Sequence, residues 1–211
     1  MRYSHIAFDI DGTLIDTEQA TLLSMQKAAF LHTGRKYRLE ELRFSLGITG
    51  EDALRKLRIK DVQGCNRLWA EKYRELASLT KAFAGAASTL ARLQQAGCSL
   101  GIVTSKSAEE YAADFTPFGL TGLFRVVVCA DDTARHKPDP EPLLKYLELA
   151  GADPRDTLYI GDTAYDLQCA RGAGVDFALA LWGCGPSRDI CPDFALNELS
   201  EIPGIVGILE K

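Results

Sequence analysis

The chain has 211 residues, 46% of them hydrophobic and 25% charged, which is ordinary for a globular protein with one large domain or a core and a small insert. A net charge of −5 without a basic stripe disfavours a nucleic-acid partner. No apolar run is long enough to span a membrane, and Asp9 and Asp11 interrupt the apolar core of any signal peptide. The six cysteines include no Cys-x-x-Cys pair, which disfavours zinc and a disulfide framework. These features predict a cytoplasmic protein and leave its oligomeric state open.

The first predicted element is a strand over residues 4–10, and it carries two acids. Asp9 and Asp11 are two residues apart, so a strand would point them the same way, and Gly12 then turns the chain. Both carboxylates therefore lie at the carboxyl end of a strand, where α/β sheets bind ligands. Two carboxylates so close repel each other and favour a hard cation such as Mg²⁺. A calcium loop is excluded, because Ala20 stands where the closing glutamate would be needed.

The next part of the chain is predicted to be helical, with no convincing strand before residue 83. Helical periodicity covers residues 17–32, 50–57 and 64–79. We therefore predict a helical insert (residues 16–82) that follows the first strand. An insert at that place is well positioned to act as a lid over a site.

From residue 83 onward, strands and helices alternate regularly. Predicted helices cover 84–96, 108–118, 141–150 and 164–170, and predicted strands cover 99–104, 124–129, 157–160, 175–181 and, weakly, 194–196 before a C-terminal helix. Such alternation implies a parallel sheet with helices on both faces. The predicted fold class is α/β, with a doubly wound, Rossmann-like core formed by residues 1–15 and 83–211.

Polar residues follow three of the later strands. Thr104 and Ser105 stand between a strand and a helix, where hydroxyls and N–H groups bind anions or simply cap the helix. Lys137 lies in a proline-flanked loop, although a lone loop lysine is usually solvated. Asp162 and Asp166 are four residues apart at a helix start, so they share one face. Capping explains any one of these residues but not the coincidence of all of them on consecutive strand ends.

Taken together, four motifs in this order resemble those of the haloacid dehalogenase (HAD) superfamily of phosphohydrolases. The motifs are Asp-x-Asp-Gly-Thr-Leu, an apolar strand ending Thr-Ser, Lys-Pro, and Gly-Asp-x-x-x-Asp, and they span residues 6 to 166. The helical insert after the first motif resembles the capped subgroup with phosphoglycolate phosphatases and β-phosphoglucomutase. The resemblance thus implies a Rossmann-like core with an all-helical cap.

The resemblance also implies a reaction that this chemistry supports. Asp9 would attack phosphorus to form an aspartyl-phosphate, and Asp11 would act as general acid and base. Mg²⁺ would be held by the Asp9 carboxylate, the Asp11 main-chain carbonyl and Asp162.

The remaining motif residues receive supporting roles from the same resemblance. Thr104, the Ser105 backbone and Lys137 would bind the phosphoryl oxygens. Asp166 would lie behind the metal ligands and orient water or Lys137. The implied substrate is a small phosphorylated metabolite.

Four other functions are less consistent with these residues than phosphatase activity. A carbon–halogen hydrolase needs neither Mg²⁺ nor the second acid, and a non-catalytic relative would be expected to lose the nucleophile or the lysine. No Gly-x-Gly-x-x-Gly follows a strand, which disfavours a dinucleotide-binding protein. A phosphosugar mutase must grip a distal phosphate, but the β-phosphoglucomutase lysine, arginine and histidine correspond here to Leu46, Gly50 and Thr21. Arg43 could compensate from a neighbouring turn.

The substrate itself is not predicted by the motifs. Specificity is expected to come from the helical insert, around residues 43–52 and from Arg35 and Lys36. The same charges are equally typical of a solvated helix face.

Overall fold

The computed structural model describes residues 2–183 and 191–208, and its centre is a six-stranded sheet. The strands are β1 (His5–Phe8), β4 (Ser99–Val103), β5 (Val126–Val128), β6 (Thr157–Gly161), β7 (Asp176–Ala180) and β8 (Phe194–Leu196). Their order is β5-β4-β1-β6-β7-β8, and every neighbouring pair is parallel. The chain builds outward from β1 on one side and then returns to the other side at β6. This switch point beside β1 is where doubly wound sheets bind ligands, and the predicted fold class is confirmed.

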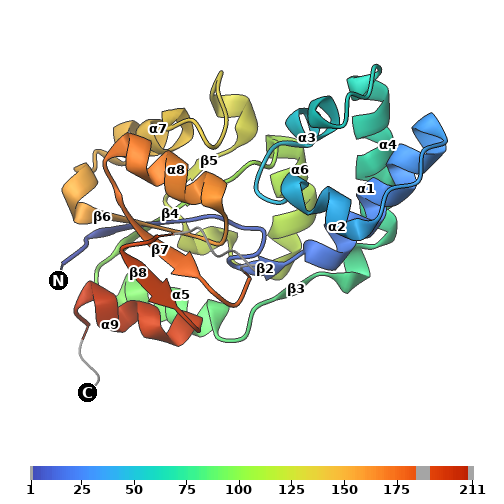
Figure 1. Ribbon diagram of the computed structural model, residues 1–211. Helices are drawn as coiled ribbons and strands as arrows, with labels where there is room; N and C mark the ends of the chain where they lie inside the picture. Colours follow the sequence, from blue (N-terminus) through green and yellow to red (C-terminus); the bar gives the residue numbers. More distant parts are fainter. Residues whose placement is uncertain (1, 184–190, 209–211) are drawn as a thin grey trace.

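Helices cover both faces of the sheet (Figure 1). Helices α5 (Ala86–Gln95) and α9 (Ile202–Val206) pack on one face, and α7 (Glu141–Ala150) and α8 (Ala164–Ala173) pack on the other. The strands alternate between the two resulting cores. In β1, Ile6 and Phe8 enter the core under α5, whereas Ala7 enters the core under α7.

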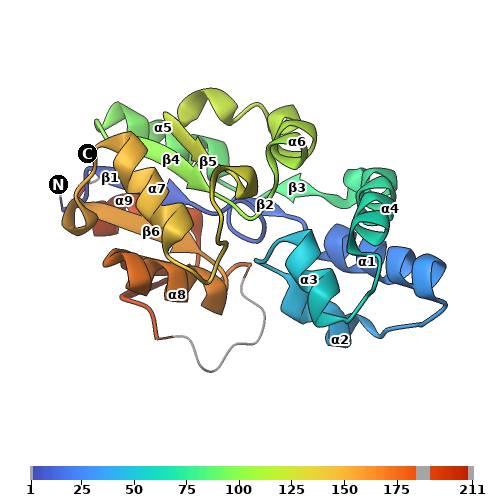
Figure 2. The same ribbon diagram turned by 90° about the horizontal axis from the view of Figure 1, so that it is seen from above.

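The helical insert forms a bundle with a core of its own. Its helices are α1 (Glu18–Thr33), α2 (Leu39–Leu42), α3 (Gly50–Lys56) and α4 (Val62–Glu75). Met25, Leu54 and Trp69 are buried between them, and the Trp69 indole donates a hydrogen bond to the Ser24 hydroxyl at 2.9 Å. Figures 1 and 2 both show the insert at one end of the sheet. The proposed division of the chain into core and cap domains stays a prediction.

The structure corrects the sequence analysis in several short segments. The prediction that no strand lies between β1 and residue 83 was wrong. Strand β2 (Ile15–Asp16) pairs with β3 (Lys81–Ala82) where the chain enters and leaves the insert. Strands of two residues are too short to show alternation. The single turn α2 was not predicted either, and α4 ends earlier than expected, at Glu75, before a 3₁₀ turn over Ala77–Leu79.

The helix predicted over 108–118 is irregular. It begins as α6 (Ala108–Glu110), widens to a π-turn over Tyr111–Phe115 and ends as a 3₁₀ turn over Thr116–Phe118. Pro117 has no N–H to continue an α-helical hydrogen-bond ladder, so the regular pattern cannot run through it.

Membrane-spanning helices and disulfides can be assessed in the described part of the chain. No helix there is both long and apolar enough to cross a membrane. Of the five cysteines there, none forms a disulfide; Cys191 is exposed and the other four are buried. Cys184 lies outside the described residues.

Candidate active site

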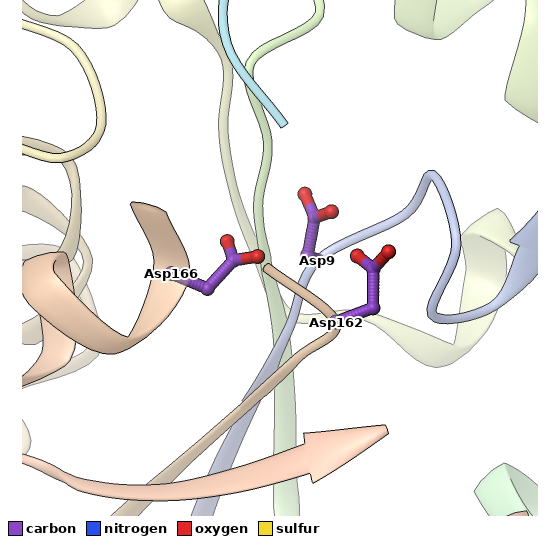
Figure 3. Close-up of side chains that lie close together, drawn as sticks. All are labelled: Asp9, Asp162 and Asp166. Atoms are coloured by element: carbon purple, nitrogen blue, oxygen red, sulfur yellow. The ribbon is translucent and has the colours of Figure 1, made fainter. Parts of the chain in front are cut away.

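Two strand ends bring three aspartates together. Asp9 directly follows β1, and its N–H donates to the Ile160 carbonyl at 2.9 Å, which extends the pairing with β6. Asp162 directly follows β6, and Asp166 lies on the first turn of α8. Carboxylate oxygens of Asp9, Asp162 and Asp166 lie within 4.8 Å of one another, and all three residues are buried (Figure 3).

Lys137 completes this group from the loop before α7. Its Nζ donates to Asp9 Oδ1 and to Asp166 Oδ1, each at 2.8 Å, and the residue is only 2% exposed. Asp166 also accepts from the Tyr159 hydroxyl at 2.9 Å and from both the N–H and the hydroxyl of Thr163. These bonds occupy both oxygens of Asp166 and join it directly to Lys137.

Burial dominates the electrostatics of these acids. Loss of solvent raises the pKa of Asp9 well above its ordinary value; Lys137 opposes the rise, and Asp166 and Asp11 add to it. The pKa of Asp162 is also raised, first by burial and then by Asp166 and Asp9. Burial lowers the pKa of Lys137, but the two carboxylates outweigh that effect and keep the ammonium charged.

The donors at this place fit a magnesium ion. Asp162 Oδ1 is buried and has no hydrogen-bond partner among the described residues. An unpartnered buried carboxylate oxygen is costly unless a cation or donor reaches it. The Asp9 and Asp162 carboxylates supply only oxygen atoms, which Mg²⁺ prefers. The residues present therefore suit the cation that the motifs imply.

These raised pKa values predict a pH-dependent metal effect on stability. In metal-free protein, folded Asp9 and Asp162 hold protons that the unfolded chain has already released, so stability falls as pH rises above about 4. Mg²⁺ needs both carboxylates ionised and should bind more tightly as pH rises. We expect the rise in melting temperature on replacing chelator by Mg²⁺ to be larger at pH 8 than at pH 5.5. An equal rise at both pH values would contradict the metal assignment.

Asp11, the second acid of the first motif, lies beside a second lysine. Lys106 Nζ is 3.4 Å from Asp11 Oδ1 and 2.9 Å from Asp114 Oδ2, and its side chain is only 11% exposed. Lys106 is not among the site residues that the sequence motifs predicted. Lys106 immediately follows Thr104-Ser105 after β4, the strand that pairs with β1, and this position in the sequence could have indicated it as a site residue.

Thr104 and Ser105 lie at the end of β4, next to the end of β1. Thr104 is buried, and its hydroxyl accepts the N–H of Lys106 at 3.2 Å. The Ser105 hydroxyl donates to the Gly47 carbonyl in the helical insert at 2.9 Å. Ser105 therefore links the core to the insert through its side chain, which the sequence did not predict.

A cavity of about 460 Å³ lies between the core and the helical insert. Asp9, Asp11 and Asp162 line its core side. The segment expected to set specificity contributes Ser45–Ile48 and Gly50, while Arg43 does not line the cavity and instead forms two hydrogen bonds with the Glu18 carboxylate, at 2.5 and 2.9 Å.

The other two expected specificity residues also lie elsewhere. Arg35 stacks over the Tyr37 ring, 4.5 Å from its centre, and Lys36 is exposed; neither lines the cavity. Among the described residues, the cationic side chains that do line it are Lys106, Arg67 and Arg74.

Gly12 keeps the first loop close to Asp162. Its φ is +78°, and a Cβ built there would overlap the Asp162 carboxylate. We predict that Gly12→Ala raises the Mg²⁺ concentration needed for half-maximal activity at least about tenfold, because Asp162 must move. Gly119→Ala is the matched control, since its φ is +71° but its Cβ would meet nothing within 4 Å. Both should lose about 1–2 kcal/mol of stability from the backbone conformation alone. Equal metal requirements in the two variants would contradict the prediction.

A parallel sheet with acidic strand ends lies below a helical insert, and a cavity separates the two. The chain belongs to the haloacid dehalogenase-like hydrolase family, whose model matches residues 6–180. A pyrophosphatase PpaX from Oceanobacillus iheyensis is 32% identical over 96% of both chains. A crystal structure from Lactobacillus plantarum, provisionally named phosphoglycolate phosphatase, has a TM-score of 0.89 and 28% identity, covering 97% of this chain and 100% of its own. A HAD-superfamily hydrolase of subfamily IA from Geobacter sulfurreducens has a TM-score of 0.72 and 26% identity, covering 98% and 97%.

Proposed function

We propose that the protein is a Mg²⁺-dependent phosphatase that hydrolyses a small phosphomonoester through an aspartyl-phosphate on Asp9. The observation that carries this proposal is the buried Asp9 carboxylate, held by Lys137 at 2.8 Å on the wall of the cavity. The names of the relatives, pyrophosphatase and phosphoglycolate phosphatase, support the same class of reaction.

The proposed reaction has two displacements at phosphorus. In the first, an Asp9 oxygen bonds to phosphorus while the bond to the ester oxygen breaks, and Asp11 gives its proton to the leaving oxygen. In the second, water bonds to phosphorus and gives a proton to Asp11, which frees Asp9 and releases inorganic phosphate. Both acids line the cavity, so both can reach the same phosphoryl group.

The other motif residues bind and neutralise the phosphoryl group in this proposal. Lys137, Thr104 and the Ser105 backbone bind its oxygens, and Asp166 keeps Lys137 in place. Mg²⁺, when held by the Asp9 carboxylate, the Asp11 main-chain carbonyl and Asp162, supplies further neutralisation of the phosphoryl charge.

We also propose that the helical insert acts as a cap domain on a core of residues 1–15 and 83–211. Several polar contacts join the two parts. Ser105 donates to Gly47, His136 Nδ1 lies 3.2 Å from Asp52 Oδ2, and the Tyr165 hydroxyl donates to the Phe44 carbonyl at 3.3 Å. A closed cap would exclude bulk water from the reacting group.

Hydrolysis is favoured over the mutase alternative by the position of Arg43. A mutase must hold the distal phosphate of a sugar while the molecule turns around. Arg43 was the residue that could have replaced the missing mutase cations, but Glu18 binds its guanidinium and Arg43 does not line the cavity.

The proposal also includes a cytoplasmic location. It is supported by buried cysteines that form no disulfide within the described residues.

A magnesium titration of two variants tests the proposed function. Phosphate release from a panel of small esters should vanish with a chelator and return with Mg²⁺. Asp162→Ala should raise the Mg²⁺ requirement at least about tenfold, because a charged ligand is lost. Asp139→Ala should leave it unchanged, since Asp139 accepts the Glu141 N–H and pairs with Arg135 away from the three-aspartate group. Similar requirements in both variants would show that the metal site is misplaced.

A further inference from the structure

The cationic side chains that line the cavity differ in whether an acidic side chain pairs with them. Lys106 lies between Asp11 and Asp114, at 3.4 and 2.9 Å. Arg74 is 3.5 Å from Glu109. Arg67 forms no ion pair or hydrogen bond with any residue in the described parts of the chain, although it lines the same cavity.

The acids that line the outer part of the cavity are also engaged by other groups. Glu18 binds Arg43, and Glu110 accepts the Ser107 N–H at 2.8 Å as part of a helix cap. Asp114 and Glu109 are the partners of Lys106 and Arg74. The guanidinium of Arg67 therefore remains as a positive charge that these outer acids do not neutralise.

Other polar groups of α4 that lack hydrogen-bond partners among the described residues line the cavity beside Arg67. Asn66, Ala70 and Tyr73 follow helical spacing along one side of α4, and all three line the cavity beside Arg67. The Asn66 side chain makes no hydrogen bond with any described residue. The Tyr73 hydroxyl is buried and likewise has no partner in the described part of the chain.

We propose that Arg67 and Asn66 bind an anionic group on the leaving part of the substrate. The inference rests on the proposed function, in which the reacting phosphoryl group lies on the core side of the cavity at Asp9. A guanidinium binds a carboxylate or a phosphate through two parallel hydrogen bonds, and an amide beside it can donate a third. The substrate class is therefore a phosphate ester or anhydride with a second anionic group, not an alkyl phosphate whose only charge is on the reacting phosphoryl group.

Three substrates of similar size separate the possible anions. 2-Phosphoglycolate carries a carboxylate, pyrophosphate carries a second phosphate, and ethyl phosphate carries no second anion. In Arg67→Gln we expect kcat/KM to fall about 10- to 100-fold for at least one of the anionic substrates and to change less than about twofold for ethyl phosphate. A loss confined to pyrophosphate assigns a phosphate, and a loss confined to 2-phosphoglycolate assigns a carboxylate.

Lys60→Gln is the matched control. Lys60 is exposed on the same insert, forms no ion pair with any described residue and does not line the cavity. It removes the same charge from the cap without touching the cavity, so all three rates should stay unchanged. Equal losses for all three substrates in Arg67→Gln, or a loss no larger than that of Lys60→Gln, would overturn the proposal.

A binding measurement separates this inference from the proposed function. In the Asp9→Asn background, calorimetry with Mg²⁺ present should show that Arg67→Gln weakens binding of the favoured anionic substrate at least about tenfold and leaves inorganic phosphate unchanged. Equal weakening for inorganic phosphate, or no weakening for either anionic substrate, would overturn the subsite. A wild-type protein that releases no phosphate from any of the three substrates would instead contradict the proposed function, while selective weakening would still support the subsite.

Discussion

Asp9→Asn should lower phosphate release by a factor on the order of 10⁴ or more while the protein still folds. The amide has almost the same shape as the carboxyl but cannot attack phosphorus. Folding should survive because burial already disfavours the charged form of Asp9, as its raised pKa indicates, and Lys137 keeps its bond to Asp166. Phosphate release under Mg²⁺ and thermal unfolding of the same preparation measure the two effects.

Asp139→Asn is the control for this change. It replaces an acid of the same size in the loop that carries Lys137, where its partners are the Glu141 N–H and Arg135. Activity should stay within a few-fold of wild type. Retention of a tenth of wild-type activity by Asp9→Asn would exclude the covalent role.

Lys137→Met should have the largest effect on stability. It removes the buried cation that bonds both Asp9 and Asp166, and it leaves those carboxylates without the charge that Lys137 supplies. Breaking a buried pair in this way costs about 3–5 kcal/mol of unfolding free energy. Denaturant unfolding in the presence of a chelator should show the loss, which should be smaller at pH 5 than at pH 8 because protonation relieves the acids.

A double variant distinguishes charge from packing as the cause. Lys137→Met with Asp166→Asn removes one carboxylate together with the cation, so it should recover part of the lost stability but none of the activity. Lys60→Met removes an exposed lysine and should stay within about 0.5 kcal/mol of wild type. A double variant no more stable than Lys137→Met alone would show that lost packing, not unpaired charge, causes the effect.

The core of the fold could be predicted because its signals are local. Short apolar runs in strands such as β1 and β6, together with glycines after the helices, indicated most elements of the parallel sheet. The rule that ligands gather at the carboxyl ends of strands then predicted that Asp9 and Asp162 would meet.

Other features depend on contacts between distant segments and could not be predicted. The pairing of β2 with β3 involves only two residues of each strand. Arg67 is noticeable only once α4 is seen to line the cavity. The pattern of α4 showed which residues share a face, but the part of that face that meets the core is set by how the insert packs.

Trapping the covalent intermediate tests the central claim most directly. Wild-type protein would be mixed with Mg²⁺ and substrate, quenched within milliseconds, reduced with borohydride and digested for mass spectrometry. An aspartyl-phosphate is reduced to homoserine, so the account predicts homoserine at position 9, only when substrate is present. Homoserine at another acidic position, or an unmodified Asp9 across the whole quench series while phosphate is released, would contradict it.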